Sequence, residues 1–205
     1  MSDPSPSRTM WESRYAVDHY IFGVEPNDFL RDHVDTIPSG NVLCVAEGEG
    51  RNATFLATRG LEVHSVDISD AGVAKTLRLA AERGVTVHAQ VADLATHDIG
   101  IAQWDAIVSI FAHMPPDVRR SLHRRVVDAL KPGGVLLLEA YTPDQIGRGT
   151  GGPKVPEMTM SLATLTDELA GLEVVHAAEL VRWVVEGPDH SGDGAVVQYI
   201  ARKPC

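Results

Sequence analysis

The chain has 205 residues, 44% of them hydrophobic and 22% charged, which is the composition of a single water-soluble globular domain. Its formal net charge of −10 opposes binding to a polyanion, so we expect no nucleic-acid partner. No apolar stretch is long enough to span a bilayer, and the N-terminus lacks an apolar signal core. The two cysteines, Cys44 and Cys205, are far apart in sequence, which favours a reducing compartment. We therefore expect a cytoplasmic protein with no membrane partner.

The first 36 residues precede the regular part of the pattern. Residues 1–9 are polar and rich in Pro and Ser, and we expect a flexible tail there. Residues 10–36 carry two short helical patterns separated by a turn around residues 23–26, where Gly and Pro occur. We expect one domain over residues 10–205, with residues 10–36 forming N-terminal lid helices.

From residue 41 onward, short apolar runs alternate with helical patterns. Strands are predicted at residues 41–46, 61–67, 85–91, 105–111 and 135–140, because each run is short, apolar and bounded by turn residues. Helices are predicted at residues 51–59 and 116–130. Another helix is predicted to run to about residue 83, with Ser69 and Asp70 as candidate caps at its start. An irregular stretch at 142–159 and a further helix at about 161–170 follow.

The C-terminal part has a different pattern. Residues 172–185 and 195–203 are two strand-like runs with no helix between them, and residues 187–194 supply turn residues. Parallel strands need helical crossovers, whereas a hairpin makes an antiparallel pair. The predicted fold class is therefore α/β, a Rossmann-like doubly wound sheet of seven strands, mostly parallel, with an antiparallel C-terminal hairpin strand.

A glycine loop lies between the first predicted strand and the first helix. Gly48, Gly50 and Ala53 have the spacing of the dinucleotide fingerprint, and Asp67 ends the second strand, where a carboxylate can bind both ribose hydroxyls. This spacing fits NAD and S-adenosylmethionine (SAM) alike, and it also fits a tight turn without a ligand.

Charge distinguishes the two cofactors. The loop carries Glu47 and Glu49, which would oppose the pyrophosphate of NAD, whereas SAM has a cationic sulfonium and an ammonium and no phosphate. The predicted terminal hairpin also favours a methyltransferase over an NAD-dependent oxidoreductase, and the chain lacks a clear catalytic Tyr-x-x-x-Lys or similar acid–base pair.

Three segments carry a family resemblance. Residues 42–52, VLCVAEGEGRN, resemble motif I of class I SAM-dependent methyltransferases. Residues 11–15 with 23–27 are similar to the N-terminal cofactor lid of the bacterial branch that resembles tellurite-resistance and thiopurine methyltransferases, and residues 130–134 resemble the turn before the fifth strand. The resemblance implies SAM as cofactor, S-adenosylhomocysteine as product, and transfer of the methyl group to a small-molecule acceptor by in-line displacement.

The resemblance also implies a set of cofactor contacts. Arg14 would pair with the methionine carboxylate, Glu47 with the methionine ammonium, Asp67 with the ribose and Asp93 with the adenine amine, although Arg14 also fits a surface arginine and Asp93 a helix cap. The full predicted set is Trp11, Arg14, Tyr15, Glu47, Gly48, Gly50, Asn52, Asp67, Ile68, Asp93, Leu94 and Phe111. Two departures from the family pattern concern Cys44, which replaces an acid, and Ala46, which replaces the first glycine.

The catalytic candidates follow the fourth and fifth strands. His113 could accept a proton from the acceptor, but a structural role is favoured because methyl transfer often needs no base; Tyr141 could point into the pocket. The glycine-rich residues 142–159 fit a mobile substrate lid or a disordered surface loop, and His190 in the terminal turn is a weaker candidate for the same pocket.

Other expectations concern metals, partners and basic residues. The histidines lack a metal-ligand spacing such as H-x-x-x-H, so we expect no metal. We expect a monomer or homodimer, and a solvated outer face for the run Arg119, Arg120, Arg124 and Arg125. A non-catalytic SAM-binding module remains an alternative to the enzyme.

Overall fold

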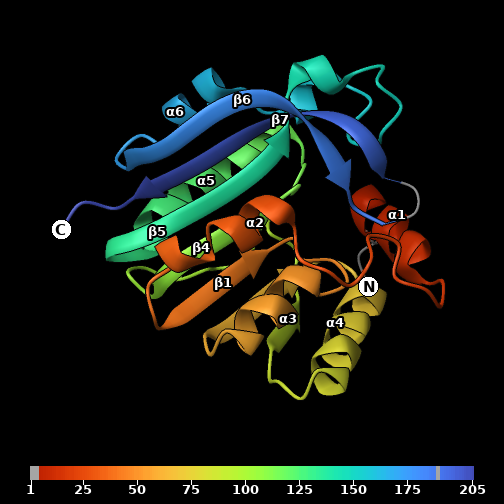
Figure 1. The fold of residues 1–205 in the computed structure, drawn as a ribbon. Coiled ribbons are helices and arrows are strands. Elements are labelled where there is room, and N and C mark those ends of the chain that lie inside the picture. The colour runs from red at the N-terminus through yellow and green to blue at the C-terminus, as the bar shows by residue number, and fades with distance from the viewer. Residues whose placement is uncertain (1–4, 188–189) are drawn as a thin grey trace.

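A computed structural model describes residues 5–187 and 190–205 as one three-layered α/β unit (Figure 1). The helices are α1 (Pro6–Tyr15), α2 (Asp28–Asp32), α3 (Arg51–Thr58), α4 (Asp70–Glu82), α5 (Pro116–Ala129) and α6 (Leu162–Glu168), with short 3₁₀ turns at Val34–Thr36, Pro143–Gln145 and Pro156–Met158. The strands are β1 (Asn41–Val45), β2 (Glu62–Asp67), β3 (His88–Val91), β4 (Trp104–Ile110), β5 (Leu130–Tyr141), β6 (Glu173–Val185) and β7 (Ser191–Arg202).

The seven strands form one sheet in the order β3-β2-β1-β4-β5-β7-β6. Strands β1 to β5 pair in parallel, and β7 inserts antiparallel between β5 and β6. The predicted α/β fold class, with seven strands and an antiparallel C-terminal hairpin, is confirmed. The strand order reverses between β1 and β4, and the loops after the carboxyl ends of these strands border the crevice where open α/β sheets bind ligands.

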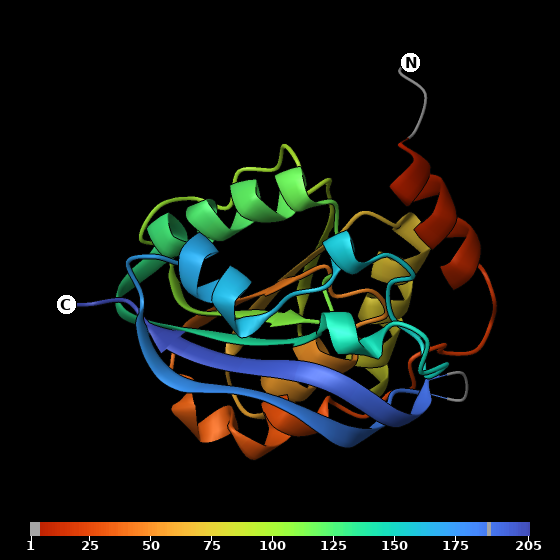
Figure 2. The ribbon, with the colours of Figure 1, turned by 90° about the horizontal axis from the view of Figure 1, so that it is seen from above.

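Helices cover both faces of the sheet. Figure 2 shows α5 and α6 on one side and α2 and α3 on the other. Leu122 and Val126 of α5 and Leu165 of α6 pack with Leu43 and Ile107 of the sheet. The opposite face buries Phe29 and Leu30 of α2, Leu56 of α3 and Ala80 of α4 on alternate strand residues such as Val42 and Val108. The near-continuous apolar runs noted in the sequence follow from this burial on both faces.

The N-terminal helix starts earlier than the sequence pattern predicts. Helix α1 begins at Pro6, with the Ser5 hydroxyl accepting a hydrogen bond from the Arg8 amide, so the expected tail over residues 1–9 is wrong for residues 6–9. Proline suits the first helical position, because its missing N–H would have no helical partner there. Residues 1–4 of the expected tail lie outside the described residues.

Two strands also differ from their predicted bounds. Strand β5 begins at Leu130, because residues 130–134, expected as a turn, continue the strand through an irregular register opposite Trp104 and Ala106 of β4. Strand β7 begins at Ser191, inside the expected turn. The earlier start of β7 lengthens the antiparallel β6–β7 hairpin, and the end of β6 and the start of β7 lie close to α1 in both views of the ribbon (Figures 1 and 2). The hairpin thus extends to the edge of the sheet where the predicted site lies.

Among the described residues, no helix combines the length and the apolar character needed to cross a membrane.

Candidate functional site

The glycine loop connects β1 to α3 at the carboxyl edge of the sheet. Gly48 and Gly50 both have positive φ values, 66° and 92°, in the left-handed region that favours glycine. A Cβ on Gly50 would lie 2.6 Å from the Thr76 Cα, and a Cβ on Gly48 would lie 2.6 Å from the Tyr15 hydroxyl oxygen. The two glycines thus allow α4 and the N-terminal segment to approach the loop closely.

Asp67 links the ends of the first two strands. One of its carboxylate oxygens accepts from the Gly48 amide at 2.8 Å, and the other accepts from the Ser69 amide at 2.9 Å. Its burial raises its pKa, while hydrogen bonds from the Ser69 and Gly48 amides oppose that shift. Each oxygen of a carboxylate can accept more than one hydrogen bond, so these contacts leave acceptor capacity for a ligand hydroxyl.

Glu47 caps the start of α3. Its Oε1 accepts from the amides of Asn52 and Ala53 at 2.9 and 2.8 Å. Burial raises the pKa of Glu47 to about 7, although these two amide hydrogen bonds and the nearby Arg51 charge partly offset the effect. The site therefore contains a half-buried carboxyl group whose pKa lies near neutral pH.

Glu49 has a different environment from the one that the sequence argument assumed. It is 3% exposed, its Oε1 lies 2.7 Å from the Lys75 Nζ, and its Oε2 accepts from the amides of Ile21 and Phe22. Its charge is neutralised by Lys75 and holds the N-terminal segment on the loop. The electrostatic argument against NAD thus loses one of its two carboxylates, and the sheet topology becomes the stronger discriminator.

The N-terminal segment covers this loop with aromatic rings. Tyr15 is buried, and its ring stacks on Trp11 with 5.3 Å between centroids and meets Phe22 edge-on at 6.3 Å. The Arg14 guanidinium lies 5.4 Å from the Trp11 ring centroid and 5.2 Å from that of Phe22. Its Nη2 is also 3.3 Å from the His190 Nε2 in the terminal turn. Helix α1 and the hairpin tip therefore meet above the glycine loop.

The predicted adenine contacts lie after β2 and β3. Ile68 is half-buried, whereas Leu94 is buried in the core that includes Trp104 and Leu122. Asp93 is exposed, and its Oδ1 accepts from the Ala95 amide at 2.9 Å, which stabilises the turn there. This contact matches the capping alternative for Asp93 and leaves its second carboxylate oxygen for a ligand.

His113 is held by backbone groups on both ring nitrogens. Its Nδ1 is 2.9 Å from the Met158 carbonyl oxygen, and its Nε2 accepts from the Tyr141 amide at 3.2 Å. Burial lowers the pKa of His113 to about 4. A neutral imidazole whose two nitrogens both have backbone partners is a poor candidate for a proton acceptor. The His113 side chain instead joins the 142–159 segment to the end of β5.

Tyr141 and Phe111 form an aromatic wall at the ends of β5 and β4. Their rings stack with 4.5 Å between centroids, and Phe111 has a φ of 51°, unusual for a bulky residue. Burial raises the pKa of Tyr141 to about 12. A Cβ on Gly152 would lie 2.6 Å from the Tyr141 Cδ2, so the glycine-rich segment passes directly over this ring.

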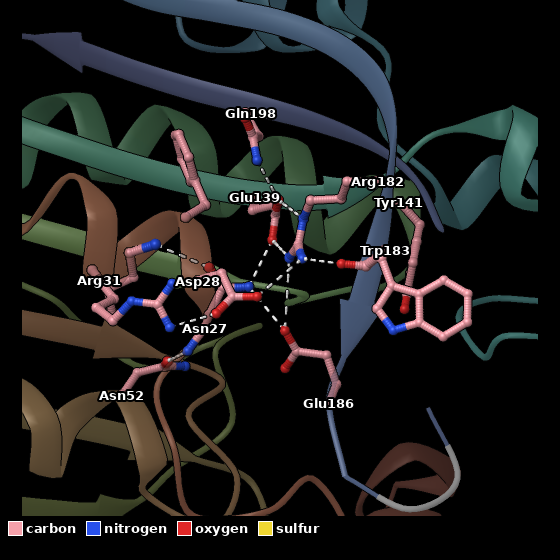
Figure 3. A network of polar contacts seen from close by, with 12 residues as sticks. Asn27, Asp28, Arg31, Asn52, Glu139, Tyr141, Arg182, Trp183, Glu186 and Gln198 are labelled. Atoms are coloured by element: carbon pink, nitrogen blue, oxygen red, sulfur yellow. Dashed lines mark hydrogen bonds and ion pairs between the residues drawn. The ribbon is translucent and has the colours of Figure 1, made fainter. Parts of the chain in front are cut away.

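A buried ionic network next to the loop was missed by the sequence analysis (Figure 3). Glu139 of β5 is 0% exposed and accepts from Asn27 Nδ2 at 2.6 Å, from Arg182 Nε at 2.8 Å and from Gln198 Nε2 at 2.8 Å. Asn27 Nδ2 also donates to Glu186, which forms an ion pair with the first residue of α3. The sequence signal was a glutamate inside the apolar strand at 135–140, because a charge there requires a buried partner.

Two residues at the start of α3 also contribute to this network. Asn52, a predicted cofactor residue, accepts from the Asn27 amide with its side-chain oxygen at 3.0 Å and thus binds the N-terminal segment. Arg51, whose pKa burial lowers to about 10, forms the ion pair with Glu186. The network therefore fixes the N-terminal segment, the start of α3 and the β6–β7 hairpin relative to one another.

The basic run on α5 is only partly solvated. Arg119 is buried, donates to Glu168, and donates to the carbonyl oxygens of Glu157 and Thr159. The Arg125 side chain donates to the His97 carbonyl oxygen. The expectation of a solvated outer face is wrong for these two arginines, because they hold loops against α5.

The parallel order β3-β2-β1-β4-β5, the antiparallel β7 and the glycine loop together define a Rossmann-like methyltransferase fold. Residues 42–134, which span β1 to the first part of β5, match the family described as a methyltransferase domain. This part of the chain thus matches a methyltransferase domain, and the predicted resemblance to class I SAM-dependent methyltransferases, with SAM as the cofactor, is confirmed at the level of this domain and of the fold.

Solved structures share the fold at low sequence identity. TehB from Haemophilus influenzae is 17% identical with a TM-score of 0.70, over 96% of this chain and 66% of that one. NodS from Bradyrhizobium japonicum WM9, an N-methyltransferase in complex with S-adenosylhomocysteine, is 15% identical with a TM-score of 0.69, over 98% and 100%. The [4+2]-cyclase SpnF is 17% identical with a TM-score of 0.70, over 97% and 95%. No curated protein matches the sequence.

Proposed function

We propose that this protein transfers a methyl group from SAM to a small-molecule acceptor at the carboxyl edge of β1, β4 and β5. The observation that carries the proposal is the glycine loop, which lies beside the Asp67 carboxylate and beneath α1, within a sheet of methyltransferase strand order. The match to a methyltransferase domain over residues 42–134 supports the same reaction. The cytoplasmic location expected from the two free cysteines belongs to this proposal.

The residues of the loop fit SAM. Gly48 has no Cβ, so a ligand can approach its backbone once the Tyr15 hydroxyl that lies against it moves away, whereas Gly50 allows the close packing of α4 on the loop. In the proposed complex Asp67 accepts hydrogen bonds from the ribose hydroxyls, and Glu47 faces the methionine ammonium. Ile68, Asp93 and Leu94 border the adenine, as the family resemblance implies.

Helix α1 is the proposed cover of the cofactor. The Tyr15 hydroxyl lies directly against Gly48, so SAM can reach the loop only when Tyr15 and α1 move outward. Trp11 and Arg14 move with Tyr15, because the three side chains pack together on one helix. In the closed complex Arg14 pairs with the methionine carboxylate.

The acceptor side favours a small molecule. Phe111 and Tyr141 form its wall, and the segment at 142–159 covers it, with the Thr150 carbonyl oxygen 3.5 Å from the Tyr141 hydroxyl. A site covered on two sides by α1 and by this segment suits an acceptor that fits within it. The net charge of −10 disfavours a nucleic-acid acceptor.

Position and charge, rather than proton transfer, are the proposed contributions of the protein. Bound SAM supplies a methyl group on a cationic sulfonium that is already activated toward a nucleophile. Phe111 borders the cation with its ring face, and the aromatic wall holds the acceptor in line. With the pKa of His113 near 4 and that of Tyr141 near 12, neither residue accepts a proton at neutral pH. The acceptor therefore arrives as a nucleophile that needs no base, such as a thiolate or another soft anion.

Turnover of SAM to S-adenosylhomocysteine tests this proposal, with a panel of thiols, chalcogen oxyanions, phenols and amines. We expect methyl transfer to at least one soft anionic acceptor. The Tyr141→Phe variant keeps its rate within about threefold, since Tyr141 contributes its ring and not its hydroxyl. SAM binding without turnover on any acceptor would overturn methyl transfer in favour of a SAM-binding module or another reaction, such as that of the structurally similar cyclase.

A further inference from the structure

A second group of titratable side chains lies on β2 and the edge strand β3, far along β2 from the proposed cofactor site. Glu62 begins β2 and Asp67 ends it, so Glu62 lies at the opposite end of the strand from the ribose carboxylate. His64 is two residues after Glu62, and side chains two residues apart on a strand point to the same face. His88 of β3 is the direct register partner of His64. Three side chains therefore meet on one face of two paired strands.

The geometry of this group is that of a metal site. One ligand atom from each of Glu62, His64 and His88 lies within 4.8 Å of the other two. The two imidazole rings stack with centroids 4.7 Å apart and an interplanar angle of 26°. The His88 Nε2 is 2.6 Å from the Glu62 Oε1. Trp104 packs edge-on against His64 with 5.1 Å between centroids, which restricts the orientation of that ring.

We propose that Glu62, His64 and His88 bind a divalent transition-metal ion, with Zn²⁺ as the best match. Zinc takes imidazole nitrogens and carboxylate oxygens at about 2.0–2.2 Å, which places the ligand atoms of a tetrahedral site about 3.3–3.5 Å apart. Small rotations of two exposed side chains bring the three atoms to that spacing, because Glu62 is 58% and His88 49% exposed. Water completes the fourth position. Two imidazoles disfavour Mg²⁺ and Ca²⁺, which prefer oxygen ligands.

The proposed ion has a structural role. It joins the edge strand β3 to β2, its neighbour in the sheet. Three ligands at the surface predict micromolar binding rather than the tight binding of a closed four-ligand site. The proposal departs from the sequence expectation of no metal. A search for ligand spacing within one helix misses ligands that the register of two strands brings together.

Equilibrium titration with ZnCl₂ tests the site, on tag-free protein at pH 7.5 in a buffer that does not bind zinc. We expect one equivalent of zinc with a micromolar dissociation constant. The His88→Ala variant should weaken binding at least tenfold, because it removes one of three ligands. The matched control is His19→Ala, which removes another exposed histidine outside the group. It should bind zinc as the parent protein does.

Thermal unfolding supplies a second readout that separates binding at this group from binding elsewhere. Zinc should raise the unfolding temperature of the parent protein and of His19→Ala, and it should leave that of His88→Ala unchanged. A single cooperative unfolding transition without zinc reports that each of the three proteins is folded. Absence of zinc binding up to 1 mM in the parent protein, or equal zinc binding by His88→Ala, would overturn the proposal.

Discussion

At the scale of single residues, the surroundings of two carboxyl groups, those of Glu47 and Glu139, determine their charge and their role. Glu47 lies in the glycine loop with only backbone amides on its Oε1, and its pKa rises to about 7. Glu139 is fully buried and accepts hydrogen bonds from Arg182, Asn27 and Gln198, so its charge is compensated. The first carboxyl group is therefore ready to respond to a cationic ligand, and the second serves to fix the surrounding segments.

Glu47 should make SAM binding depend on pH. The protonated form must lose its proton to pair with the methionine ammonium, so binding strengthens as pH rises through about 7. Between pH 6.0 and 7.5 we expect the affinity to rise about five- to tenfold, with proton release on binding. Calorimetry in buffers of different ionisation enthalpy measures both effects. The Glu47→Gln variant should show neither, and an unchanged pH dependence in that variant would remove Glu47 from the ammonium contact.

Removing Arg182 should destabilise the fold strongly. Arg182→Met leaves the fully buried Glu139 without its ion-pair partner, and breaking a buried pair from one side costs about 3–5 kcal/mol. Urea denaturation of Arg182→Met, and of the double variant Arg182→Met with Glu139→Gln, measures the free energy of unfolding. The double variant should recover at least half of the loss. If it is no more stable than the single variant, the cost does not come from the uncompensated charge.

At the scale of elements, the N-terminal segment and the β6–β7 hairpin hold each other above the glycine loop. Glu49 fixes the amides of Ile21 and Phe22, and Arg14 reaches His190. Gly187, with a φ of 82°, lies against the Ile21 carbonyl group so closely that a Cβ there would collide with it. The close packing predicts that small changes at the hairpin tip alter the segment that covers the cofactor.

Gly187→Ala should destabilise the protein more than an equally strained alanine elsewhere. Gly60 is a matched control, because its φ of 84° is close to the 82° of Gly187 while a Cβ there would meet nothing within 4 Å. The left-handed backbone costs about 1–2 kcal/mol in each variant. The collision with Ile21 adds about 1–3 kcal/mol in Gly187→Ala alone. Urea denaturation compares the two, and equal losses would show that the hairpin tip does not press on the N-terminal segment.

Helix α1 should report cofactor binding through Trp11. Trp11 stacks on Tyr15, which must leave Gly48 when SAM enters, so its fluorescence should change on titration with S-adenosylhomocysteine. The Trp11→Phe variant should still bind by calorimetry but lose the signal, since Trp104 is buried in the core and Trp183 is exposed on β6. A signal of the same size in Trp11→Phe would place the change elsewhere.

At the scale of the whole molecule, the sheet order places every proposed cofactor contact at one edge. Loops after β1, β2 and β3 supply the loop carboxylates and the adenine contacts, and loops after β4 and β5 supply the aromatic wall. The antiparallel hairpin brings its tip back to the same edge, where it meets α1. The sheet order, the closing segments and the negative net charge together support a small acceptor.

The sequence predicted the parts of this arrangement that depend on local pattern. Short apolar runs between helices predicted the parallel strands, and the lack of a helix between the strand-like runs at 172–185 and 195–203 predicted the hairpin. The partners of individual side chains were harder to predict from the sequence, because they come from distant parts of the chain. Glu49 was counted, from its position in the loop, as a negative charge that opposes the pyrophosphate of NAD, but Lys75, 26 residues away, neutralises it. Likewise, His64 and His88 show no spacing motif, and only strand register brings them together.

The central claim is that the glycine loop between β1 and α3 binds SAM. Parallel calorimetric titrations of the purified protein with SAM, S-adenosylhomocysteine and NAD test it most directly. We predict that SAM and S-adenosylhomocysteine each bind with one-to-one stoichiometry and that NAD gives no binding heat at millimolar concentration. Binding of NAD without binding of either SAM or S-adenosylhomocysteine would contradict the claim.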